Sequence, residues 1–283
     1  MNLDALPYTS FIVLAEFCVG SLAVCVYAER RGRVAKSFVQ FCAWMVVVGA
    51  LVLLLNGLAL DPNAIVGGYR LEDGLLRAVR IASAVFLALC LPYAVVTGRE
   101  DGAPATAWAA PGLVSGAVLL GLTAYYVSLP TWGFAGMLLS ILGGTLAVGA
   151  VVLAMTLGHW YLVTPRLPRE PMEELTLIVL AAVALQALLL VINVFIPVRD
   201  APDATAFLGS KTLEVNPAFW LRIIIGLAFP AALAWMSYVA SRGYPANENA
   251  MMSATGLLYI AVGAVVVGEV LARGLLFLTG VPV

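Results

Sequence analysis

The chain has 283 residues, of which 63% are hydrophobic and only 11% are charged, whereas a soluble domain carries roughly 25% charged residues. A chain this apolar could not cover itself with polar surface in water, which excludes a soluble globular protein. The formal net charge of -1 and the lack of a basic stripe exclude nucleic acid as a partner. We therefore expect an integral membrane protein in contact with membrane lipids.

A helix needs about 20 apolar residues to cross a hydrocarbon core of about 30 Å. The segments that meet this requirement predict eight transmembrane helices, at residues 9–28, 38–60, 79–97, 107–127, 133–157, 174–197, 217–240 and 251–279. Helices satisfy their own backbone groups in lipid, so the fold class is all-α. The connectors are short, which predicts a single integral membrane domain over residues 1–283, arranged as one bundle or as two four-helix bundles.

The distribution of Lys and Arg predicts the orientation of the chain. The odd-numbered loops, on one face, contain eight such residues: Arg30, Arg31, Arg33, Lys36, Arg99, Arg166, Arg169 and Arg242. The opposite face has four, or six if Arg80 and Arg222 at helix starts are counted: Arg70, Arg77, Arg199 and Lys211. We expect the first loop to be cytoplasmic and both termini to be extracytoplasmic. The segment MNLDALPYTS has no basic region, so the first apolar run is expected to remain as a helix.

Ionisable side chains inside a bilayer are costly and often mark functional sites. Five fall within or at the starts of the predicted spans: Glu16, Arg80, Arg222, Glu269 and Arg273. Glu269 and Arg273 are four residues apart, so they share a helix face and can pair. We expect all five to converge on one polar cluster in the outer half of the membrane.

Two other interpretations of these charges remain open. The five residues could form a structural ion-pair network that locks four helices together, and Arg80 and Arg222 could each extend to the nearby membrane surface. If the cluster binds a ligand or handles protons, Glu16 and Glu269 are the candidate catalytic residues, because short acidic side chains reach the surface poorly.

The single histidine, His159, precedes Trp160 and Tyr161 at the end of the fifth span. One histidine excludes a bis-histidine haem site, and no methionine is paired with it by the sequence. We expect an interfacial histidine beside an aromatic belt; a haem ligand is the alternative, and haem b is not expected.

The small residues of the chain are interpreted as packing residues. The fifth span contains Gly143, Gly144, Gly149 and Gly158, which predicts a central helix that its neighbours approach closely. The cysteines lie in apolar runs with no metal-ligand spacing, so we expect packing roles and no metal site for Cys18, Cys25, Cys42 and Cys90.

No GxSxG, Walker, HExxH or CxxC pattern is present, which leaves a hydrolase or an ATPase without support.

Two segments resemble a known family: YYVSLPTW (125–132), followed by the Gly-rich fifth span, and GEVLARGLLF (268–277). Both are similar to the membrane anchor subunit of dimethyl sulfoxide reductase, within the polysulfide reductase type of quinol-interacting anchors. The resemblance implies a haem-free eight-helix subunit of a bacterial-type inner membrane. It also implies an iron–sulfur partner subunit, a molybdenum-type catalytic partner subunit, and electron transfer from menaquinol or another quinone.

The sequence departs from this family at two positions. The family commonly has an acid in the third span and a histidine at the end of the second, where this chain reads RIASAVFLALC and LLLNGLAL, with Asn56 as the only polar side chain near the second position. Glu16 or Glu269 would then accept the proton of the quinol, or the subunit would only anchor its partners.

The leading hypothesis is therefore a membrane anchor subunit of a multi-subunit oxidoreductase. Its quinone head group would be surrounded by five residues: Glu16, Arg80, Arg222, Glu269 and Arg273. One alternative is a structural, non-redox subunit of a respiratory or photosynthetic complex. Another is a small-molecule transporter built from two four-helix halves, in which Pro92 and Pro230 would kink the third and seventh spans.

Overall fold

A computed structural model of the protein describes residues 5–61, 65–66, 69–71, 73–98, 105–128, 133–164, 167–195, 213–243 and 249–283. Eight helical segments among these residues are long and apolar enough to cross a membrane. The protein is thus an all-α, multi-pass membrane protein, as its composition predicts.

The helices agree with the predicted spans, with several extended at their ends. Their bounds are α1 Leu6–Arg31, α2 Lys36–Ala59, α3 Asp73–Thr97, α4 Thr106–Tyr126, α5 Gly133–Val163, α6 Glu170–Phe195, α7 Pro217–Ile223, η4 Ile224–Ala228, α8 Phe229–Ser241 and α9 Asn249–Thr279. Two short strands, β1 Ile65–Val66 and β2 Tyr69–Arg70, pair antiparallel between α2 and α3. The segments α7, η4 and α8 together form the seventh span, Pro217–Ser241.

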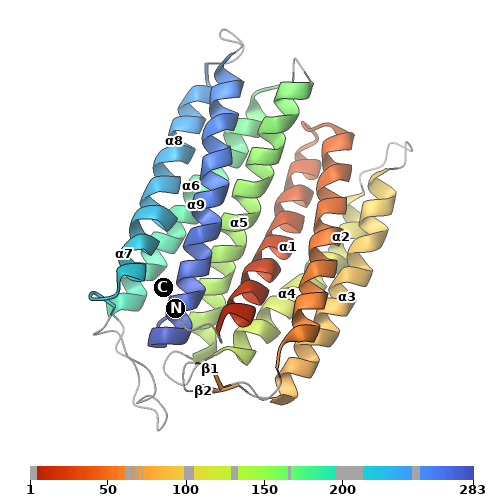
Figure 1. Ribbon diagram of the computed structural model, residues 1–283. Coiled ribbons are helices and arrows are strands. Elements are labelled where there is room, and N and C mark those ends of the chain that lie inside the picture. The colour runs from red at the N-terminus through yellow and green to blue at the C-terminus, as the bar shows by residue number, and fades with distance from the viewer. Residues whose placement is uncertain are drawn as a thin grey trace.

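The helices form two groups of four spans that lie side by side (Figure 1). In the first group, α1 contacts α2 and α4, and α3 contacts both of these. In the second group, α5 contacts α6 and α9, and α8 contacts both of these. We call these groups the N-terminal bundle (α1–α4) and the C-terminal bundle (α5–α9). They meet mainly where α1 packs along α5, with further contacts from α4 and α9.

Glycine makes the contact between α1 and α5 unusually close. A Cβ atom added to Gly20 would lie 1.9 Å from the backbone oxygen of Thr145, and one added to Gly149 would lie 2.2 Å from the backbone carbon of Gly20. Only glycine is compatible with such an approach of two backbones. This confirms the prediction that the glycines of the fifth span pack a central helix.

The seventh span is helical throughout but changes its winding at η4, a π-helical turn. Pro230 follows this turn in the first turn of α8. Proline has no N–H to donate to the carbonyl four residues earlier, and its ring crowds that carbonyl. A wider turn directly before Pro230 relieves both problems. The π turn packs against α9, where Gly226 and Gly268 approach closely enough that a Cβ added to Gly268 would lie 2.4 Å from the Cα of Gly226.

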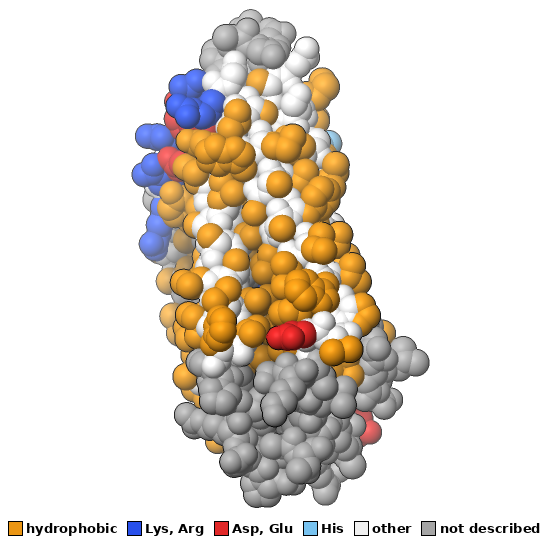
Figure 2. All heavy atoms as spheres, turned by 90° about the vertical axis from the view of Figure 1, so that its left-hand side faces the viewer, with side chains coloured by type: hydrophobic (Ala, Val, Ile, Leu, Met, Phe, Trp, Pro, Cys, Tyr) orange, Lys and Arg blue, Asp and Glu red, His pale blue; other side chains and the backbone are white. Residues whose placement is uncertain are grey.

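The outer surface has the polarity expected of a protein in a bilayer. Hydrophobic side chains cover much of the face shown in Figure 2, and the basic side chains gather toward one end, while acidic side chains occur near both ends. That end includes the exposed Arg30, Arg31 and Arg33 at the α1–α2 connection. Arg99, Arg166, Arg199 and Lys211, which entered the orientation count, lie outside the described residues, as do residues 129–132 of the family-like segment.

Candidate functional site

Four of the five predicted charged residues meet in one buried cluster where the two bundles join. Glu16 comes from α1, Arg222 from α7, and Glu269 and Arg273 from α9. All four are almost completely buried, with exposed fractions of 2% or less. We call these four residues the charge cluster.

Ion pairs run continuously through the charge cluster. Nη2 of Arg273 lies 2.5 Å from Oε1 of Glu16 and 3.1 Å from Oε2 of Glu269. Nη1 of Arg222 lies 3.1 Å from Oε1 of Glu269. Two carboxylates and two guanidinium groups give a net charge of zero, which is the condition under which buried charges are tolerated in a low-dielectric interior. Among the described residues of the N-terminal bundle, Glu16 alone contributes to this network.

Polar side chains from α5 and α6 complete the cluster. Nη1 of Arg273 donates a hydrogen bond to Oγ of Ser140 at 2.7 Å, and Nη2 donates to the backbone oxygen of Ser140 at 3.0 Å. The side-chain amide of Gln186 donates to Oε1 of Glu269. These neutral partners fix the orientation of the Glu269–Arg273 pair on α9.

The cluster fits between the bundles because residue 144 of α5 is glycine. A Cβ atom at Gly144 would lie 2.6 Å from Oε2 of Glu269, 2.7 Å from Oε1 of Glu16 and 2.8 Å from Nη2 of Arg273. All three distances are too short for a real side chain, so Gly144 provides the space in which the charges meet. The sequence had indicated a packing role for this glycine, and its neighbours are the charged groups themselves.

The carboxyl groups lie deep along their helices. Glu16 is ten residues from the start of α1 and Glu269 is ten residues from the end of α9, which corresponds to about 15 Å at a rise of about 1.5 Å per residue. Helix α1 begins and α9 ends at the same end of the molecule (Figure 1). The cluster is therefore near the middle of a hydrocarbon core of about 30 Å, on the side of that end.

Arg80 does not belong to the charge cluster, and the prediction that all five charges converge is wrong in this respect. Its Nε donates to the backbone oxygen of Gly57 at 2.8 Å, and its Nη2 donates to that of Leu60 at 2.6 Å and that of Leu58 at 3.3 Å. The last carbonyls of a helix have no partner within the helix and carry partial negative charge. Arg80 satisfies them at the end of α2.

His159 lies far from the charge cluster, on the exposed surface of α5. Its Nδ1 is 2.9 Å from the hydroxyl of Tyr259 on α9, and the two rings meet edge to face. Fifteen residues of α5 separate His159 from Gly144, or about 22 Å along the helix. His159 is thus an exposed residue near one end of the bundle, and it contributes nothing to the polar network at Glu16 and Glu269.

Several polar atoms of the site have no hydrogen-bond partner among the described residues. They are Oε2 of Glu16, Oε1 of Gln186, Nε of Arg273 and Nε of Arg222. A buried polar atom without a partner costs about 1–3 kcal/mol. A cavity of about 10 Å³ lies beside Gln186 and Arg222, and Ser140 also lines it. A volume of about 10–15 Å³ is the least that a water molecule needs.

A larger apolar groove lies beside this cavity, between α6 and the start of the seventh span. Its volume is about 560 Å³, and its lining is mostly apolar, with Val191, Val194, Phe219, Trp220 and Ile223 beside the single acidic residue Glu214. Leu190 lines both the groove and the small cavity. We call this the α6–α7 groove. Arg222 and Gln186 do not line the groove and lie on the other side of Leu190, in the small cavity. The volume of the groove lies within the range of about 300–1,000 Å³ that is usual for ligand pockets.

Sequence reasoning missed Gln186, Ser140 and the particular role of Gly144. Gln186 is the only amide side chain within the apolar run TLIVLAAVALQALLLVI of α6, and a polar residue in such a run usually bonds to a neighbouring helix. The position of Gln186 in this run was therefore a sequence signal for a contact between helices. All four cysteines are buried and form no disulfide, which agrees with the predicted packing roles.

The chain matches no protein-family model. A search of curated proteins likewise finds none that matches it.

Proposed function

We propose that the protein is the membrane subunit of a multi-subunit oxidoreductase and binds a quinone in the α6–α7 groove. The observation that carries this proposal is the position of that groove: an apolar slot whose inner neighbour, Leu190, also borders Arg222 and Gln186. A quinone needs an apolar site for its ring and tail, with hydrogen-bonding groups at the ring oxygens. Both requirements meet at this point of the C-terminal bundle.

The charged residues supply the chemistry of quinol oxidation in this proposal. A quinol that becomes a quinone loses two electrons and two protons. Arg222 donates a hydrogen bond to a ring oxygen, and the carboxylate of Glu269 accepts a proton. Glu16, which Arg273 holds beside Glu269, accepts the second proton. The electrons pass to an iron–sulfur cluster of a partner subunit.

The partners and the membrane follow from the family resemblance of the segments 125–132 and 268–277. They are an iron–sulfur subunit and a molybdenum-type catalytic subunit, the quinone is menaquinone or a related compound, and the location is a bacterial-type inner membrane. Arg80, which the sequence suggested as a quinone ligand, has no role at the head group, because its donors are bonded to the end of α2.

The first test is quinol-dependent electron transfer by the complex that contains the Glu269→Gln variant. Glutamine keeps the shape of the side chain and removes its basicity, so we expect turnover to fall about 100-fold or more. Glu174→Gln is the matched control, because Glu174 pairs with Arg31 on the exposed surface. Turnover that is unchanged in Glu269→Gln would reject the catalytic role.

The second test addresses the groove. Val191 is half exposed and lines the α6–α7 groove, so Val191→Trp fills the slot without disturbing the core. The KM for quinol should rise at least tenfold, while Val267→Trp, which enlarges an equally exposed residue of α9, should leave it unchanged. Equal KM values in both variants would place the quinone elsewhere.

A second candidate function is transport. Two four-helix bundles joined across a Glu16–Arg273 ion pair resemble the two-part construction of transporters, and the π turn of the seventh span lies next to the charge cluster. A purely structural subunit is the third hypothesis, since every charge of the cluster has an opposite charge within 3.1 Å.

Mild detergent extraction distinguishes these hypotheses. Copurifying iron–sulfur and molybdenum subunits support the proposal, and a solitary protein with solute flux in vesicles supports transport.

A further inference from the structure

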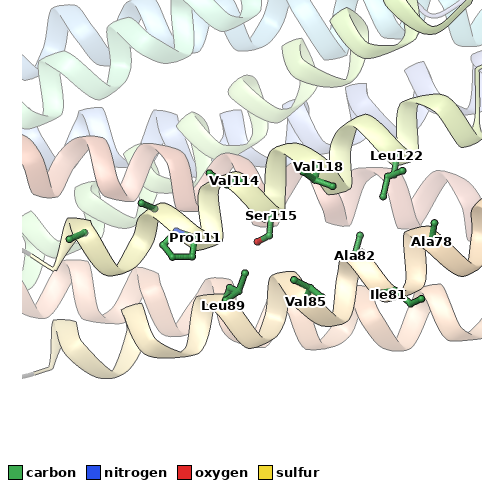
Figure 3. A pocket seen from close by; sticks show the side chains of 12 residues that line it. Ala78, Ile81, Ala82, Val85, Leu89, Pro111, Val114, Ser115, Val118 and Leu122 are labelled. Carbon is green, nitrogen blue, oxygen red and sulfur yellow. The ribbon is translucent and has the colours of Figure 1, made fainter.

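A second and longer groove lies on the outer face of the N-terminal bundle, between α3 and α4. Its volume is about 880 Å³. In Figure 3, Ala82, Val85 and Leu89 point toward it from α3, and Ser115 points into it from α4. We call this the α3–α4 groove. It shares no lining residue with the α6–α7 groove.

The chemistry of the α3–α4 groove selects hydrocarbon. Ser115 contributes the only polar side chain of its lining, and the hydroxyl of Ser115 already donates to the backbone oxygen of Gly112 at 3.0 Å. A water molecule needs two to four polar partners, and none is available here. Ile81, Val85, Val114 and Val118 are between 44% and 65% exposed, so the groove is open to the surrounding lipid.

The length of the groove favours a single lipid chain over a transmembrane helix of another protein. The lining runs from Ala78 to Leu89 on α3 and from Ala107 to Leu122 on α4. These distances are about 16 Å and 22 Å at a rise of about 1.5 Å per residue. A partner helix would cross the full hydrocarbon core of about 30 Å, whereas the chain of a lipid in one leaflet occupies about half of it.

A positive charge lies at one end of the α3–α4 groove. Arg77 is exposed and directly precedes Ala78, the last lining residue at that end. It shares a face of α3 with Ile81, four residues further on. Arg77 forms no hydrogen bond or ion pair with any residue within the described ranges. Near the start of a membrane-spanning helix, such a side chain reaches the level of the lipid phosphates.

We propose that the α3–α4 groove binds an acyl chain of one glycerophospholipid, whose phosphate pairs with Arg77. The apolar lining holds the chain and the guanidinium holds the anionic group, so the two features select the two parts of the same molecule. The bound lipid acts as a fixed component of the N-terminal bundle. This proposal does not depend on the proposed redox function.

The test is native mass spectrometry of the full chain in mild detergent, titrated with phosphatidylglycerol. Ala110 is exposed and lines the groove, so Ala110→Phe fills it. Gly263→Phe is the control, because Gly263 is exposed and a Cβ atom added there meets no atom within 4 Å. We expect one tightly bound lipid in the wild type and in Gly263→Phe, and at least a tenfold weaker affinity in Ala110→Phe. Ala107→Phe provides a second filling variant should Ala110→Phe not fold.

The contribution of Arg77 is measured in the same titration. Arg77→Gln should weaken phosphatidylglycerol binding roughly fivefold, the effect of one basic residue on an anionic lipid. Arg30→Gln, at the opposite end of the bundle, should leave phosphatidylglycerol binding unchanged. Equal lipid binding by the wild type and both filling variants would overturn the proposal. So would recovery of a quinone in place of the lipid, or a dimer of this chain that Ala110→Phe dissociates.

Discussion

Glu16 and Arg273 lie 2.5 Å apart across the junction of the two bundles, although 257 positions separate them in the sequence. This ion pair is the only charged contact in the cluster that joins α1 to the C-terminal bundle. Both side chains are buried, and breaking a buried pair is more costly than breaking one at a surface. The first predictions concern this contact and the glycine beside it.

Glu16→Gln should destabilise the protein strongly. The change leaves Arg273 with one carboxylate in place of two, and loss of one partner from a buried pair costs about 3–5 kcal/mol. Thermal unfolding in detergent should show a clear fall in Tm. Glu174→Gln removes an exposed pair with Arg31, for which about 0–1 kcal/mol is expected. Similar Tm changes in the two variants would show that the Glu16 pair is worth no more than a surface contact.

Gly144→Ala should disrupt the charge cluster without changing any charge. The added Cβ would lie 2.6–2.8 Å from atoms of Glu269, Glu16 and Arg273, and overpacking of this kind costs about 1–3 kcal/mol. Gly121→Ala is the control, because a Cβ there meets no atom within 4 Å. That substitution should stabilise α4 by up to about 1 kcal/mol, since alanine favours a helix. A Gly144→Ala variant as stable as Gly121→Ala would contradict the described geometry.

Gly149→Ala should separate α1 from α5. A Cβ at this position would lie 2.2 Å from the backbone carbon of Gly20, and a backbone atom cannot move aside as a flexible side chain does. In size-exclusion chromatography, the monodisperse peak of the protein should be lost or much reduced. Gly256→Ala, where the added atom meets open space, should keep the wild-type profile. A normal profile for Gly149→Ala would mean that the bundles can meet at a greater distance.

Arg80→Gln should affect stability and leave quinone chemistry intact. The guanidinium group of Arg80 donates to the backbone oxygens of Gly57 and Leu60. Glutamine has no charge and cannot replace both donors, and hydrogen bonds to charged groups contribute about 1.5–3 kcal/mol. The Tm should fall, while quinol turnover per assembled complex stays at the wild-type value. A specific loss of turnover at unchanged Tm would return Arg80 to the quinone site that the sequence first suggested.

The sequence predicts the membrane fold well because hydropathy and helix length are local properties. All eight spans are present. The ends are less predictable: α5 continues to Val163, six residues past the expected end at 157. A helix does not need to stop where the hydrocarbon stops, because its backbone bonds remain satisfied in the interfacial region.

The charge cluster was predictable only in part. The cost of burying Glu16, Glu269 and Arg273 in lipid makes a meeting of opposite charges necessary, and the structure shows it. Arg80 could not be separated from this group by sequence, because its acceptors are backbone carbonyls at the end of α2, which have no signature in the side-chain pattern. Gly144 is likewise indistinguishable in sequence from Gly143, since only the three-dimensional neighbours differ.

The distance in sequence between Glu16 and Arg273 has a consequence for biosynthesis. Ribosomes add about 5–20 residues per second, so the acid of the first helix waits roughly 13–50 s before its cation has been translated. During that interval α1 sits in the bilayer, or in the insertion machinery, with an uncompensated carboxyl group. The ion pair between the two halves of the molecule can therefore form only after α9 is inserted, later than the contact between α1 and α5.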